Sequence, residues 1–167
     1  MKKNTPLLSS VVFGVFYFLL TAGAHFSRSI LELFIFLMLF LPGLTFPFST
    51  FAFSSMSFRY HEIRIVLFII LSVADYYAMV WLYSGEGYYS FLPAAAGFLG
   101  ALLYHLAAKL LLNAPGALWK IFVTALLSGA AFLPYVFSQS NLLLLGMALL
   151  LWTVINGWLI NASRKLP

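Results

Sequence analysis

Residues 64–84 read RIVLFIILSVADYYAMVWLYS and contain a single acidic residue, Asp75, near their centre. At ~1.5 Å per residue, this stretch is long enough to cross a hydrocarbon core of ~30 Å as one α-helix. A carboxylate within such a helix is costly in lipid, so it should face other helices or water. The stretch therefore predicts a transmembrane helix that belongs to a bundle.

The composition extends this prediction to the whole chain of 167 residues. Hydrophobic residues make up 63% of the sequence and charged residues 8%, whereas about a quarter of a soluble domain is charged. The mean hydropathy is +1.02, which leaves no segment for a soluble domain. We expect a single all-α transmembrane domain over residues 1–167. The absence of cysteine excludes disulfides, thiol redox chemistry and cysteine-ligated metals.

Five further apolar stretches accompany the central one. Pro42-Gly43 and Pro47 interrupt the second stretch, so its helix should kink or break. Pro134 lies near the end of the fifth stretch. The sequence thus predicts a compact bundle of about six transmembrane helices with short loops, at approximately 7–24, 30–53, 64–84, 90–112, 118–137 and 142–160.

The basic residues predict the orientation of this bundle. If the first helix starts in the cytoplasm, only Arg28 of the nine basic residues lies on the outer side. This asymmetry favours an even number of spans in the cell (inner) membrane, with both termini cytoplasmic. The first stretch also resembles a cleavable secretory signal, whose removal would leave five spans. Four spans would require the second or fifth stretch to be re-entrant.

Repeats of small residues, together with one asparagine, indicate where the helices meet. Ala96-x-x-x-Gly100, Gly97-x-x-x-Ala101 and Ala125-x-x-x-Gly129 place small residues four apart, which lets helix backbones approach closely in lipid. We expect these faces to pack within one chain. Asn156, in the sixth stretch, is predicted to form a hydrogen bond between helices.

Asp75 and His105 form the predicted intramembrane polar site. His105 lies in the fourth stretch, at a depth that differs from that of Asp75 by roughly 6 Å. Since small shifts move histidine across physiological pH, an Asp–His pair could bind a proton. In the alternative, Asp75 is a structural contact held by His105 or by the hydroxyls of Ser72, Tyr76 or Tyr77.

Enzyme motifs are missing from the sequence. It contains no H-E-x-x-H, no second membrane aspartate and no G-x-S-x-G. The three histidines, His25, His61 and His105, are predicted at three different levels of the bundle, which is unfavourable for a metal centre. We therefore expect no enzyme activity, no cofactor and no metal site.

Two classes of function remain. In the preferred one, the protein is a small membrane subunit that forms homo-oligomers or anchors a partner protein at a basic cytoplasmic face; no direct contact with nucleic acid is expected. The residues of this face that could contact a partner or lipid headgroups are Arg59, His61, Arg64, Lys109, Lys120, Arg164 and Lys165.

The alternative function is a proton- or cation-coupled transporter or channel that uses Asp75 and His105. The six stretches divide into two halves of three, and the second stretch of each half carries proline. Broken helices at corresponding positions of two halves are typical of transport sites.

Overall fold

The computed structural model describes residues 5–38, 41–50, 61–84, 91–114, 117–138 and 141–163. The elements of these ranges are all α-helices, as the sequence predicted. They are α1 (Thr5–Phe26), α2 (Arg28–Met38), α3 (Leu41–Thr50), α4 (His61–Ser84), α5 (Leu92–Leu112), α6 (Leu118–Ala130), α7 (Leu133–Val136) and α8 (Leu142–Ser163).

The lengths and hydropathies of the helices fit a multi-pass integral membrane protein. Five spans have the length and apolar character needed to cross a membrane, with α6 and α7 forming one of them. The pair α2 and α3 adds a sixth if the two helices are counted as one broken span. The central stretch around Asp75 forms α4, the longest of the described helices.

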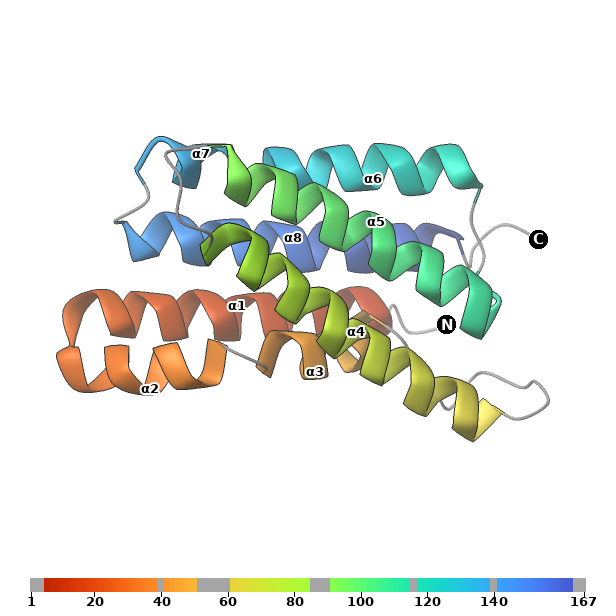
Figure 1. The fold of residues 1–167 in the computed structure, drawn as a ribbon, viewed down its shortest axis with the longest axis horizontal. Helices are drawn as coiled ribbons and strands as arrows, with labels where there is room; N and C mark the ends of the chain where they lie inside the picture. The colour runs from red at the N-terminus through yellow and green to blue at the C-terminus, as the bar shows by residue number, and fades with distance from the viewer. Residues whose placement is uncertain are drawn as a thin grey trace.

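The helices are stacked along a common long axis (Figure 1). Helix α1 lies antiparallel to α8, and α4 and α5 cross them obliquely. The first residues of α1 and the last residues of α8 lie at the same end of the bundle. The beginnings of α4 and α6 and the end of α5 lie at this end as well, so it carries all the described helix ends that the sequence assigned to the basic side.

Proline and asparagine define the helix boundaries. The predicted second helix is broken, and the axes of α2 and α3 meet at 70°. The predicted fifth helix is also interrupted, because a turn at Ala131 and Phe132 separates α6 from α7. Pro93 lies in the first turn of α5, where it is tolerated. That helix ends at Asn113, whose left-handed backbone has a φ of 48°.

The small-residue faces pack within one chain, as predicted. A Cβ atom at Gly129 in α6 would lie 2.9 Å from the carbonyl oxygen of Ala94 in α5. At Gly97, a Cβ atom would overlap the ring of Phe132. Ala101 and Ala125 are fully buried. Glycine at these positions therefore allows α5 and α6 to approach closely.

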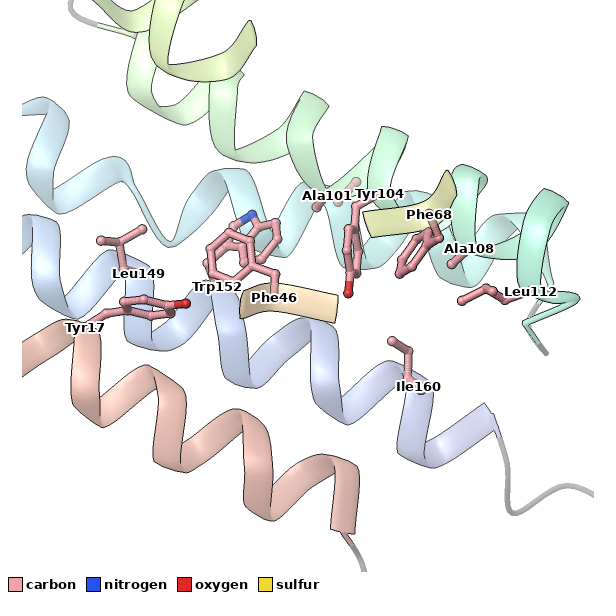
Figure 2. Close-up of a cluster of buried hydrophobic side chains, with 11 residues drawn as sticks. Tyr17, Phe46, Phe68, Ala101, Tyr104, Ala108, Leu112, Leu149, Trp152 and Ile160 are labelled. Carbon is pink, nitrogen blue, oxygen red and sulfur yellow. The ribbon is translucent and has the colours of Figure 1, made fainter. Parts of the chain in front are cut away.

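A cluster of buried side chains occupies the centre of the bundle (Figure 2). It joins α1, α3, α4, α5, α6 and α8 through Tyr17, Phe46, Phe68, Ala101, Tyr104, Ala108, Leu112, Ala125, Leu149, Trp152 and Ile160. Large apolar side chains also cover the outside, among them Leu19, Leu110 and Trp158. Apolar residues on both the inside and the outside are what a bundle surrounded by lipid requires.

Candidate intramembrane site

Helix α3 contains a carbonyl group that its own backbone cannot bond. In a regular helix the carbonyl of Gly43 would accept from the amide of residue 47, but Pro47 has no amide hydrogen. The hydroxyl of Ser72 in α4 donates to this carbonyl instead, at 2.8 Å. The contact is close, because a Cβ atom at Gly43 would lie 2.9 Å from the Cα of Val73.

The end of α2 has the same arrangement. Pro42 cannot donate to the carbonyl of Met38, the last residue of α2. The hydroxyl of Tyr76 donates to that carbonyl at 2.5 Å. Ser72 and Tyr76 are four residues apart and lie on one face of α4, so a single helix face bonds both of these carbonyls.

Helix α1 also forms hydrogen bonds with α3. The hydroxyl of Ser10 donates to the carbonyl of Ser49 at 2.9 Å. The hydroxyls of Tyr17 and Thr45 are hydrogen-bonded to each other. Hydroxyl groups of neighbouring helices thus bond the backbone of an interrupted helix, which is how membrane proteins tolerate such breaks.

A cavity of about 300 Å³ lies beside this broken helix, between α2, α3, α4, α5, α7 and α8. Its lining is mainly apolar, and Asp75 is the single charged residue among the described ones that line it. The aromatic residues of the lining are Phe34, Phe46, Tyr76, Tyr104, Phe132, Tyr135 and Trp152. An apolar pocket with one polar group is the usual form of a small-molecule site.

Asp75 has a carboxylate oxygen without a hydrogen-bond partner in the part of the chain that the structure describes. Within the described residues, Oδ1 of Asp75 is buried and has no hydrogen-bond partner. The hydroxyls of Ser72 and Tyr76, which the sequence offered as its partners, donate to the backbone of α3 and α2. The hydroxyl of Tyr77, the third candidate, belongs to a side chain that is 58% exposed.

His105 belongs to a separate polar cluster. Its Nε2 donates to Oδ1 of Asn156 at 2.6 Å, and Nδ2 of Asn156 donates to the hydroxyl of Ser128 at 3.1 Å and to the carbonyl of Trp152 at 2.6 Å. This network joins α5, α6 and α8 and confirms that Asn156 bonds between helices. A bond between Asp75 and His105 is not found among the hydrogen bonds and ion pairs of the described residues. The joint role of the two residues stays a prediction.

Three described basic residues lie at one end of the bundle, whereas Arg28, at the start of α2, lies at the opposite end. Arg64 is in the first turn of α4, Lys109 in the last turn of α5, and Lys120 in the first turn of α6, and Figure 1 shows these three helix ends at the same end of the bundle. His61 is 3.7 Å from its neighbour Glu62. Three further predicted members of the basic face, Arg59, Arg164 and Lys165, lie outside the described residues.

The sequence did not predict the aromatic lining or the bonds of α3. Two signals for the hydrogen bonds to α3 were present in the sequence. Pro42 and Pro47 each remove an amide donor, and Ser72 and Tyr76 place two hydroxyl groups on one face of α4. The lining residues come from six helices, and nothing in their sequence spacing brings them together. Across the described part of the chain, no three His, Asp or Glu side chains are grouped as metal ligands.

Taken together, the apolar helices fit a multi-pass integral membrane protein, and the cavity among them has one acidic side chain in its described lining. Comparison of the chain with protein-family models, with curated proteins and with solved structures finds no match.

Proposed function

We propose that this protein is a small membrane transporter that binds a proton or a cation at Asp75. The observation that supports this most directly is the buried Oδ1 of Asp75, which has no hydrogen-bond partner among the described residues and lies at a cavity of about 300 Å³. Buried polar atoms normally have partners, so a carboxylate oxygen that lacks one among the described residues, on a residue that lines a cavity, supports a ligand at this position. Ionisable groups within membranes commonly mark ion pathways.

The two interrupted helices support the same function. Met38 of α2 and Phe46 of α3 line the cavity, as do Phe132 and Tyr135 at the α6–α7 break. Interrupted helices at matched positions of two halves are typical of transporters. Because Nε2 of His105 is bonded to Asn156, we assign ion binding to Asp75 and a supporting role to His105.

The basic end of the bundle supports an orientation. We propose that α2 and α3 form one broken span, that the bundle has six spans, and that both termini are cytoplasmic. The end that carries Arg64, Lys109 and Lys120 would then face the cytoplasm, in agreement with the positive-inside rule.

The same basic end supports a second candidate function, in which the protein is a membrane subunit that anchors an acidic partner or oligomerises. The three helix ends that carry Arg64, Lys109 and Lys120 all lie at that end. A soluble protein that co-purifies in stoichiometric amount in mild detergent, and is lost from the Arg64→Glu, Lys120→Glu double variant, would favour this second function.

Transport can be tested in proteoliposomes that contain a pH-sensitive dye. Gradients of Na⁺, K⁺ or benzyltrimethylammonium are imposed, and the proton movement driven by each is recorded. We expect at least one cation to drive proton movement through the wild-type protein and none to do so through Asp75→Asn. The matched control is Glu62→Gln, because the Glu62 side chain is 81% exposed at the start of α4. Equal proton movement in wild type and Asp75→Asn would refute the proposed function.

A further inference from the structure

We propose that the ligand of the cavity is a lipophilic monocation, with its charge at Asp75 and its apolar body against the aromatic lining. This inference rests on the proposed function in using the same carboxylate, but it makes a claim about ligand chemistry that can fail independently. Three properties of the cavity support this ligand: its aromatic lining, the charge of that lining and the cavity volume.

Four aromatic residues of the lining form a continuous row. The ring centroids of Tyr76 and Phe46 are 6.1 Å apart, those of Phe46 and Trp152 4.5 Å, and those of Trp152 and Tyr104 6.2 Å. Figure 2 shows Phe46, Trp152 and Tyr104 in the middle of the buried cluster. The row thus extends across four helices, from α4 through α3 and α8 to α5.

The polar atoms of two of these residues are bonded to the backbone. Nε1 of Trp152 donates to the carbonyl of Gly97 at 3.0 Å, and the hydroxyl of Tyr76 donates to the carbonyl of Met38. These bonds fix the orientation of the two rings, and both residues line the cavity. The face of an aromatic ring attracts a cation, most strongly where water is excluded.

The charge of the lining selects a monocation. When ionised, Asp75 supplies one negative charge, and no Lys, Arg or His is among the described residues that line the cavity. An anion would therefore meet only repulsion there. A bare metal ion would need several oxygen ligands, but the described lining is mainly apolar and offers a single carboxylate. An ammonium group with apolar substituents needs no such set of oxygens.

The volume of the cavity restricts the ligand to a small molecule. A cavity of about 300 Å³ is at the lower end of the range for small-molecule pockets. Benzyltrimethylammonium is a suitable probe, since it combines a quaternary nitrogen with one aromatic ring. Neopentylbenzene has the same shape without the charge, and tetramethylammonium has the charge without the ring.

A proton and the cation should compete for the carboxylate of Asp75, because either one neutralises its charge in an apolar site. Binding of the cation is therefore expected to tighten as the pH rises and protons become scarcer. The other titratable groups of the described lining are the phenols of Tyr76, Tyr104 and Tyr135, from α4, α5 and α7. Asp75 carries the only carboxyl group of the described lining, so the pH dependence should vanish in Asp75→Asn.

The test is calorimetric titration of the full chain in detergent with the three probes. We expect benzyltrimethylammonium to bind about tenfold or more tightly than either neopentylbenzene or tetramethylammonium at pH 8. Asp75→Asn should remove this advantage of the cation while changing the affinity for neopentylbenzene by no more than about twofold. Retained neopentylbenzene binding shows that the variant has kept the cavity folded.

An aromatic substitution tests the role of the rings. Phe46→Leu should weaken benzyltrimethylammonium binding about fivefold, whereas Phe122→Leu, at a ring that is 51% exposed on α6, should leave it unchanged. The proposal is overturned if neopentylbenzene binds as tightly as the cation or if Asp75→Asn binds the cation like wild type. Na⁺-driven, Asp75-dependent proton movement without benzyltrimethylammonium binding would overturn the ligand class and leave the proposed transport intact. Cation binding at Asp75 without any cation-driven proton movement would refute the proposed transport and leave the ligand class intact.

Discussion

The hydroxyl of Ser72 in α4 donates a hydrogen bond of 2.8 Å to the carbonyl oxygen of Gly43 in α3. Pro47 leaves this carbonyl without its helical donor, so a side chain of one helix completes the backbone bonding of another. The bond lies at the edge of the cavity that Asp75 lines. It therefore connects the broken helix to the helix that carries the candidate ion-binding residue.

A double-mutant cycle tests this relationship. Ser72→Ala should lower the free energy of unfolding by about 1–2 kcal/mol, because the buried carbonyl of Gly43 loses its donor. Pro47→Ala restores an amide at that position, so Ser72→Ala should cost less in the Pro47→Ala background. Unfolding in mixed micelles by increasing SDS would measure the cycle. Strictly additive effects would contradict the compensation, and Tyr77→Phe, on the exposed face of α4, serves as the control.

Substitutions of Asp75 should separate stability from activity. Since Oδ1 makes no hydrogen bond to the described residues, Asp75→Asn and Asp75→Leu should unfold within about 1 kcal/mol of wild type. Cation-driven proton movement should nevertheless be lost in both variants. Measuring both the stability in detergent and the proton movement of each variant distinguishes a role of Asp75 in transport from a role in folding. A large loss of stability in Asp75→Leu would instead indicate that Asp75 is a structural contact.

The close approach of α5 and α6 can be tested at Gly129. A methyl group there would lie 2.9 Å from the carbonyl of Ala94, so Gly129→Ala should force the helices apart and cost about 1–3 kcal/mol. The neighbouring Ala130 is exposed, and Ala130→Leu should have little effect. The two variants can be compared by thermal unfolding in detergent. Equal stability would show that the helices can separate at no cost.

The proposed orientation is accessible to labelling because the chain contains no cysteine. A single cysteine introduced by Glu62→Cys, at the start of α4, should react with an impermeant maleimide only after the cell membrane is opened. Phe91→Cys, at the start of α5 and the opposite end of the bundle, should react in intact cells. Both side chains are largely exposed, at 81% and 62%. The reverse pattern of labelling would place the basic end outside.

The sequence predicted those features that depend on local chemistry. Apolar length predicts the spans, Pro42 and Pro47 predict the break, and Gly129 predicts a close helix contact, since each acts through its own backbone or volume. The partners of the polar groups could not be predicted in this way. Asp75 and His105 are at similar depths, but depth does not determine which faces of α4 and α5 meet, and His105 bonds to Asn156 on α8 instead.

The bonding of Gly43 also has a consequence for how the sequence can diverge. A relative that replaces Pro47 by a residue with an amide hydrogen no longer needs a hydroxyl at position 72, whereas a relative that keeps the proline does. The two positions, in different helices, should therefore covary, as should Pro42 and Tyr76. Such paired changes would let the break in this helix be traced through distant relatives whose other residues have lost all resemblance.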